Sequence, residues 1–159
     1  MKQSFKTGIA FGVTSGVITT LGLLVGLSFS SGMKLIVIWG ILTIAVADSL
    51  SDALGIHVSQ ESDKKNKADH IRESTITTFI VKFVIACSFL IPVFIFDLTT
   101  ATIIGVVWWL LLLTILSYII AKSQKKSPLH AIFEHVGIWA LVVVITYFIG
   151  IFISSKFGA

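Results

Sequence analysis

The sequence predicts an all-α integral membrane protein with five transmembrane helices in a single domain. The chain has 159 residues, of which 55% are hydrophobic and 13% are charged, and its mean hydropathy is +0.99. This composition is far too apolar for an ordinary soluble domain. Because the chain has only two prolines and no polar tract of linker length, we expect residues 1–159 to form one transmembrane domain.

Five apolar stretches are each long enough to cross a bilayer. Each holds the roughly 20 residues that span about 30 Å of hydrocarbon at about 1.5 Å per residue. The first stretch is too long for a secretory signal and ends in Ser-Ser-Gly without an Ala-x-Ala-like site, so we expect a retained helix. The predicted helices cover residues 8–30, 34–58, 74–96, 101–121 and 129–154.

Local signals agree with these boundaries. Pro128 is a typical first-turn residue for the fifth helix, and Pro92 predicts a kink near the end of the third. Thr99 and Thr100 predict the cap of the fourth helix, after a turn at Asp97.

Positive charges fall mostly on one side of the predicted helices. The opposite side carries only Lys34 and Lys156. The side with most of the positive charge carries Lys2, Lys6, Lys64, Lys65, Lys67, Arg72, Lys122, Lys125 and Lys126. This asymmetry predicts a protein of the cell membrane with a cytoplasmic N-terminus and a C-terminus on the opposite side. The basic charge therefore reflects topology, and we expect no nucleic-acid partner.

Residues 59–73 carry mixed charge without glycine or proline, which predicts that the second and third helices extend beyond the bilayer.

The first helix carries small residues at spacings of four and three. They are Gly8, Gly12, Ser15, Thr19, Gly22 and Gly26. At about 100° per residue they share one narrow face, which favours close helix packing in a membrane. An alternative is that this face lines a path or a dimer axis, with Ser15 and Thr19 offering oxygen atoms.

Two aspartates lie one helical turn apart within the second apolar stretch. A carboxylate at the centre of a bilayer costs about 2.5–3.5 kcal/mol, so we expect a cation, a proton or a basic partner to compensate Asp48 and Asp52. With Ser51, Gly55 and Ser59 they form one polar face that runs from mid-membrane to the cytoplasm. A polar face of this kind indicates a cavity or a protein partner rather than lipid.

Histidines and glutamates occur near the cytoplasmic ends of the second and fifth helices. His57 and Glu61 are one turn apart, as are His130 and Glu134. Imidazole and carboxylate groups suit several first-row metal ions, so these pairs could collect a divalent metal at the cytoplasmic surface. The alternative is a solvated belt of polar residues at the membrane interface.

Two segments carry a more specific pattern. Residues 11–26 read FGVTSGVITTLGLLVG, and residues 47–59 read ADSLSDALGIHVS. They resemble the signatures G-x-x-D-G-I-V-S-T-L-G-L-V-V-G and A-x-x-x-S-M-A-x-G-E-Y-x-S of the first two helices of the vacuolar iron transporter family. Weaker likeness continues through residues 77–92 and 127–150. The resemblance implies a homodimer of five-helix subunits that exports ferrous iron or manganese from the cytosol, driven by protons. The path in that family runs between the first and second helices of the two subunits.

The chain departs from these signatures at three positions. Ser15 stands where the family has an aspartate, Asp52 where it has a methionine, and Ile56 where it has a glutamate. Residues 59–73 are also too few for the metal-gathering domain that larger members carry there. We interpret Asp52 as a relocated carboxylate, an interpretation that requires Ser15 and Asp52 to approach each other. An oxygen ligand in place of sulfur favours harder cations such as Mn²⁺, Mg²⁺ or Ca²⁺.

The sequence therefore predicts a proton-coupled transporter of divalent metal cations such as Fe²⁺ or Mn²⁺. Asp48 and Asp52 are the expected ligands, with Ser15 and Thr19 as auxiliary oxygens. A two-fold axis would bring up to four carboxylates together, and some of these would bind protons when no cation is present.

Other interpretations remain open at this stage. A membrane protein that transports nothing could use the same faces for dimerisation or partner binding, or the solute could be different. Lys82 could hold Asp48 and Asp52 in a structural ion pair, or its ammonium could reach water at the cytoplasmic edge. The chain has no nucleophile motif, phosphate loop or zinc-protease signature, so we expect neither an enzyme nor a cofactor beyond the transported metal.

Overall fold

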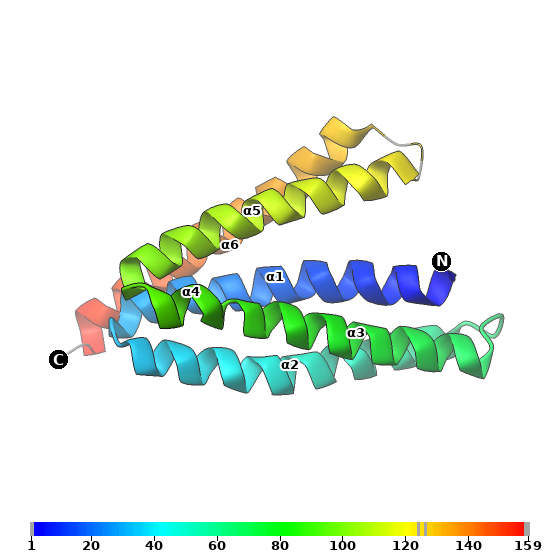
Figure 1. Cartoon of the computed structure of the whole chain (residues 1–159), viewed down its shortest axis with the longest axis horizontal. Helices are drawn as coiled ribbons and strands as arrows, with labels where there is room; N and C mark the ends of the chain where they lie inside the picture. The colour runs from blue at the N-terminus through cyan, green and yellow to red at the C-terminus, as the bar shows by residue number, and fades with distance from the viewer. Residues whose placement is uncertain (1, 124, 126, 158–159) are drawn as a thin grey trace.

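The computed structural model describes residues 2–123, 125 and 127–157, and these residues are almost entirely helical (Figure 1). The helices are α1 (Gln3–Ser31), α2 (Lys34–Ser62), α3 (Ala68–Ser88), α4 (Leu90–Ile95), α5 (Leu98–Ser123) and α6 (Pro128–Phe157). Five segments are long and apolar enough to cross a membrane, with α3 and α4 together forming the third. The predicted all-α fold with five membrane-spanning segments is confirmed at this level.

The first three helices are joined by short connections. Gly32, between α1 and α2, has a φ of 61°, and its N–H donates to the Ser28 carbonyl at 3.2 Å. Glycine adopts this left-handed conformation without steric cost, which permits the tight reversal. At the other end α2 continues to Ser62 and α3 already begins at Ala68, which confirms that both helices extend beyond the predicted spans.

The third segment is interrupted about one turn before Pro92, the residue at which a kink is predicted. Helix α3 ends at Ser88, and α4 begins at Leu90 after the single residue Phe89. Pro92 has no N–H to donate to the Ser88 carbonyl, and its ring crowds that carbonyl, so the regular hydrogen bonding breaks one turn earlier.

The cap predicted for the fourth membrane-spanning helix was wrong. Asp97, rather than Thr99 or Thr100, precedes α5, and its Oδ2 accepts a hydrogen bond from the Thr100 N–H at 2.9 Å. Because α5 begins at Leu98, both threonines belong to its first turn and are too late to cap it. The Thr100 N–H and the neighbouring donors lower the pKa of the Asp97 carboxyl.

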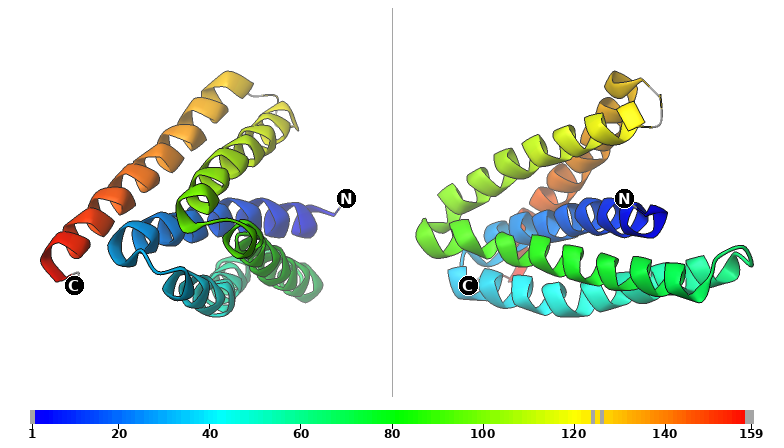
Figure 2. Two further views of the ribbon diagram at one scale, coloured as in Figure 1. Left: turned by 60° about the vertical axis from the view of Figure 1, so that its left-hand side comes forward. Right: turned by 45° about the vertical axis from the view of Figure 1, so that its right-hand side comes forward.

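The helices form two groups that share one core. Helices α1, α2 and α3 pack side by side, whereas α5 and α6 form a hairpin that crosses α1 and diverges from it towards the end that holds the N-terminus (Figures 1 and 2). Where the groups meet, Leu24 and Phe89 are fully buried, and the Phe89 and Trp109 rings stack with their centroids 4.5 Å apart.

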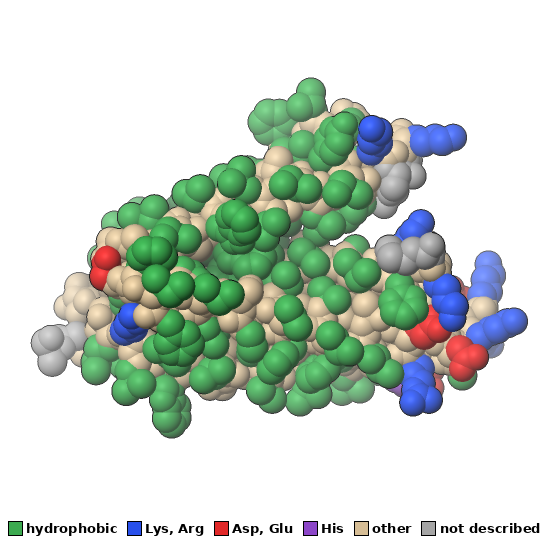
Figure 3. All heavy atoms as spheres, in the orientation of Figure 1, with side chains coloured by type: hydrophobic (Ala, Val, Ile, Leu, Met, Phe, Trp, Pro, Cys, Tyr) green, Lys and Arg blue, Asp and Glu red, His purple; other side chains and the backbone are tan. Residues whose placement is uncertain are grey.

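Charged side chains concentrate at the two ends of the molecule. Lysine and arginine gather at the end that holds Lys2 and the 63–67 connection, which we call the basic end (Figure 3). Between the ends, large apolar side chains such as Trp39, Leu54 and Trp108 are exposed. This distribution is typical of helices that face lipid.

The small-residue face of α1 is divided between two neighbours. A Cβ added at Gly8 would lie 2.7 Å from the Thr77 Cβ of α3, whereas one added at Gly22 would lie 3.1 Å from Val142 of α6. Alternating spacings of four and three average 3.5 residues, so the face drifts by about 20° per seven residues around a straight helix. The close packing predicted for the glycines is confirmed. Those near the basic end pack against α3, and those near the other end pack against α6.

Candidate functional site

A buried lysine on α3 joins the two aspartates of α2. The Lys82 side chain is 1% exposed, and its Nζ lies 2.7 Å from Asp48 Oδ2 and still closer to Asp52 Oδ2. Lys82 donates a hydrogen bond to Asp52 and another to Ser15 Oγ at 3.0 Å, and the Ser15 hydroxyl donates to Asp52 Oδ2 at 2.5 Å. We call Ser15, Asp48, Asp52 and Lys82 the carboxylate–lysine cluster.

Helix register and one glycine bring the cluster together. Asp48 and Asp52 are four residues apart on α2, so both carboxylates face the same way. Lys82 reaches them from α3 by passing α1 at Gly16, where an added Cβ would lie 3.4 Å from Lys82 Cγ and 3.1 Å from Ile85 Cγ2. A larger residue at position 16 would therefore crowd the space that the lysine stem occupies.

The cluster carries more negative than positive charge. One ammonium balances one of the two carboxylates, so a single negative charge is left over. Asp48 is the central residue of the 29-residue helix α2, far from either end of the membrane-spanning segment. An unbalanced charge at this depth is costly and calls for a further positive group.

The carboxylates are only partly enclosed by their own chain. The side chains of Asp48 and Asp52 are 29% and 21% exposed, and they open onto an outer surface of α2. On the same helix Ser51, Gly55 and Ser59 are also exposed. The predicted polar face of α2 thus lies at the edge of the packed interior: its two carboxylates contact the buried Lys82, whereas Ser51, Gly55 and Ser59 are exposed.

Three further residues with hydroxyl groups lie close to the cluster residues along α1 and α2. Thr19 is exposed and donates to the Ser15 carbonyl at 3.0 Å, and it lines a groove of about 560 Å³ between α1 and α6. Thr20 and Ser49 are fully buried, and their hydroxyls have no hydrogen-bond partner among the residues that the structure describes. Of the hydroxyl groups on these two helices, that of Ser15 is therefore the one in hydrogen-bond contact with Asp52 and Lys82 among the described residues.

The histidine and glutamate pairs lie apart from each other and from the cluster. His57 Nδ1 is 3.2 Å from Thr75 Oγ1, and Glu61 is exposed near the end of α2. His130 and Glu134 line a cavity of about 550 Å³ between α5 and α6, and these helices diverge from the first three at this end (Figure 2). Within residues 2–123, 125 and 127–157, no three His, Cys, Asp or Glu side chains are placed to share a metal ion. The uptake role of these pairs stays a prediction.

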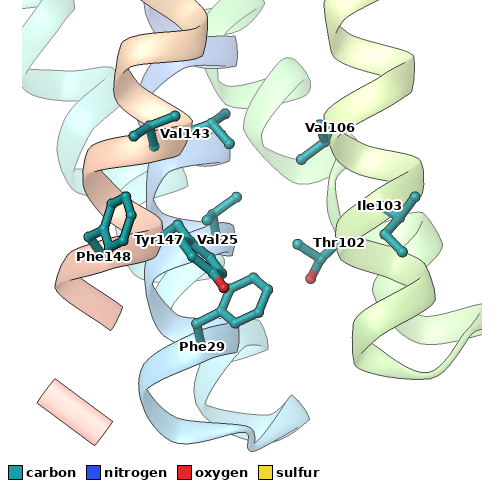
Figure 4. Close-up of a pocket in the computed structure, with 9 residues that line it drawn as sticks. Val25, Phe29, Thr102, Ile103, Val106, Val143, Tyr147 and Phe148 are labelled. Atoms are coloured by element: carbon teal, nitrogen blue, oxygen red, sulfur yellow. The ribbon is translucent and has the colours of Figure 1, made fainter. Parts of the chain in front are cut away.

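A second cavity, of about 470 Å³, is apolar. Its lining comes from α1, α5 and α6 and includes Val25, Phe29, Thr102, Val106 and Tyr147 (Figure 4). No charged side chain lines this space. It therefore offers no charged ligand to a metal ion, and the carboxylate–lysine cluster remains the candidate site.

Lys82 and Gly16, which lies beside its stem, had different signals in the sequence. Lys82 could be identified as a charge within an apolar stretch, and its alternative role as the partner of an ion pair with both aspartates agrees with the structure. Gly16 lies off the small-residue face of α1, and nothing in its spacing pointed to the lysine stem. The contact required of Ser15 and Asp52 is also present, and it forms within one chain.

The identity of the protein is constrained only by its own residues and geometry. Comparison with protein-family models found no match, and comparison with curated proteins found none either. The resemblance to the vacuolar iron transporter family therefore rests mainly on residues 11–26 and 47–59. It supports a proposal of function without showing membership of that family.

Proposed function

We propose that this protein is a homodimeric transporter of divalent cations in the cell membrane, with Asp48 and Asp52 as cation ligands. The observation that carries the proposal is the charge of the carboxylate–lysine cluster. Two carboxylates at the middle of α2 share one ammonium, which leaves one negative charge within a membrane-spanning segment. A bound cation or a proton would supply the missing positive charge.

The exposed polar face of α2 supports a homodimer. In a single chain Ser51, Gly55 and the exposed parts of the two aspartates would face hydrocarbon, which disfavours polar groups. A second copy related by a two-fold axis would cover this face and bring two clusters to one pathway. The resemblance implies the same arrangement.

The chemistry of the ligands favours a hard cation. The carboxylate oxygens of Asp48 and Asp52 and the hydroxyl oxygen of Ser15 meet at the site, and such oxygens suit Mn²⁺, Mg²⁺ or Ca²⁺ better than softer ions. The resemblance adds Fe²⁺ as a substrate and proton exchange as the driving force. With the basic end in the cytoplasm, His57, Glu61, His130 and Glu134 would lie on the side from which cations are exported.

Flux into proteoliposomes tests this function. Purified protein is reconstituted with a pH-sensitive dye inside, and Fe²⁺, Mn²⁺ or Mg²⁺ is added outside. We expect at least one of these cations to enter and to move protons in the opposite direction. Asp48→Asn combined with Asp52→Asn should abolish both signals, because no charged ligand remains.

The matched control removes two carboxylates outside the hydrocarbon. Asp63→Asn with Asp69→Asn changes exposed residues of the 63–67 connection and the start of α3, and it should transport like the wild type. Flux that survives the loss of both Asp48 and Asp52 carboxylates would sink the proposal.

A second candidate function is a membrane protein that transports nothing. It is favoured by the ion pairs of Lys82, which make Asp48 and Asp52 part of the packing between α2 and α3. In that case no cation or other solute would cross, and the double asparagine variant would change stability or dimerisation alone. The same proteoliposomes, with thermal unfolding of the two proteins, separate the candidates.

A further inference from the structure

We propose that Lys82 is an internal competitor of the cation: its ammonium occupies the cation position between Asp48 and Asp52 and limits the positive charge that the site accepts. This inference rests on the proposed function, because it takes Asp48 and Asp52 as the cation ligands. It assigns to Lys82 a role in specificity rather than in packing alone.

The surroundings of the ammonium resemble those of a small cation. Its Nζ is in contact with one carboxylate oxygen of Asp48, one of Asp52 and the hydroxyl oxygen of Ser15. Three oxygens from two helices converge on one positive centre, as they do around a hard metal ion. A cation bound between the same carboxylates would have to take the place of this nitrogen.

The lysine is held in this place by its own packing. A lysine in a membrane-spanning helix commonly extends towards the interface, where its ammonium meets water. Lys82 is instead almost fully buried, and its stem fits beside Gly16 in a slot that an added Cβ would narrow. The ammonium is therefore a built component of the site.

The charge of the cluster determines the expected effect of removing this ammonium. With Lys82 the two carboxylates have a net charge of −1, and without it they have −2. At the short separations seen here, one unit of charge strongly changes the attraction for a divalent cation in a poorly polarisable interior. Removing the ammonium should free the position between Asp48 and Asp52 and strengthen the attraction of these carboxylates for a divalent cation.

Equilibrium binding of Mn²⁺ to the purified full chain in detergent tests the inference. We expect Lys82→Met to bind Mn²⁺ at least about tenfold more tightly than the wild type. Its thermal midpoint should also rise more steeply with Mn²⁺ concentration, because a ligand stabilises the state that binds it. In a variant that also carries Asp48→Asn and Asp52→Asn, the gain should disappear.

The matched control is Lys34→Met. Lys34 lies at the opposite end of the molecule, where its Nζ donates to the carbonyls of Phe94 and Phe96. Removing that charge should leave Mn²⁺ affinity at the wild-type value. An equal gain in both variants would show a general charge effect and overturn the role of Lys82.

A second variant keeps the test decisive if Lys82→Met folds poorly. Lys82→Gln carries no charge but can still donate a hydrogen bond to a carboxylate, and it should show the same gain in Mn²⁺ affinity. Wild-type affinity in a folded variant would overturn the inference. Failure of both variants to fold in excess Mn²⁺ would overturn it too, because a cation in the ammonium's place should restore the charge balance.

The binding result is separable from the proposed function. Transport by the wild type without a gain in Lys82→Met would leave the function standing and remove the inference. A gain in binding without flux for any cation would support the competitor role and remove the transporter.

Discussion

At the scale of single residues, the central feature is one lysine that serves two aspartates. Taking three charged groups out of water is expensive, and their mutual attraction returns that cost only when the geometry is good. Here Lys82 meets both carboxylates and the Ser15 hydroxyl at once. One carboxylate would have been enough to balance the ammonium, so the second carries the negative charge on which the proposed cation binding depends.

Asp97 offers a test at the same scale but outside the membrane. Hydrogen bonds from the Thr100 N–H and neighbouring groups lower its pKa, so the folded state binds a proton less readily than the unfolded state. The carboxylate therefore contributes stability above its unfolded pKa, and this contribution is lost as pH falls through the lower folded value. We expect the thermal midpoint of the wild type to fall in acid more steeply than that of Asp97→Asn.

Thermal unfolding in detergent from neutral to strongly acidic pH measures this difference. Asp69→Asn, which removes an exposed aspartate at the basic end, is the matched variant for the general effect of one lost carboxylate. Parallel pH curves for the wild type and Asp97→Asn would contradict the capping role.

The cluster could be predicted from sequence in part. The spacing of Asp48 and Asp52 fixes them on one face of any helix, and their charge marks them as exceptional in an apolar stretch. The basic partner of these two aspartates could not be predicted in the same way. Whether Lys82 reaches them depends on the register between α2 and α3 and on the space at Gly16, and neither has a periodic signal.

At the scale of helices, glycines determine how closely α1 approaches its neighbours. Gly150 of α6 lies against α1, and a Cβ added there would be 2.7 Å from the Gly26 carbonyl oxygen and 3.0 Å from Phe29 Cβ. The nearest atom belongs to the backbone, so it cannot turn aside as a flexible side chain could. The two helices would have to separate to accept any larger residue.

Gly150→Ala should therefore lower the stability of the protein. Overpacking of this kind typically costs about 1–3 kcal/mol, and we expect a lower thermal midpoint in detergent. Gly137→Ala, on the same helix, meets nothing within 4 Å and is the matched control. It should equal or exceed wild-type stability, because alanine favours a helix more than glycine does. A Gly150→Ala protein as stable as the control would contradict the close contact.

Helix existence was easier to predict than helix ends. Apolar stretches of span length identify all five membrane segments, because hydrocarbon thickness sets the number of residues needed. Hydropathy carries no signal for a helix that continues into water, so the extension of α2 to Ser62 and the start of α3 at Ala68 had to be predicted from the lack of glycine and proline in residues 59–73. The six small residues of α1 were predicted to share one face, but the crossing of α6 divided them between two neighbours.

At the scale of the whole molecule, the polar face of α2 is the surface that a single chain leaves unsatisfied. Ser51 is exposed beside the partly exposed Asp52 at mid-membrane depth, whereas the other outer surfaces at this depth are mainly apolar. Lipid would cover the apolar surfaces well and this one poorly. A second copy is the simplest covering that also encloses the carboxylates.

Cross-linking in membranes tests this arrangement. With Cys87 replaced by serine, Ser51→Cys should form a covalent dimer with a short thiol-specific cross-linker. Val84→Cys is the matched control, because Val84 is exposed on the apolar surface of α3. Equal cross-linking at both positions would indicate random collisions, and none at position 51 would contradict the proposed dimer.

The salt bridges between α2 and α3 also bear on how the chain enters the membrane. Helix α2 inserted alone would bring two carboxylates into hydrocarbon and α3 alone one ammonium, each at a cost of about 2.5–3.5 kcal/mol. The five-residue connection 63–67 keeps the two helices adjacent during synthesis. Release into lipid as a preassembled hairpin would leave one net charge instead of three separate charges, so the pairing of Lys82 with the aspartates would lower the cost of membrane insertion.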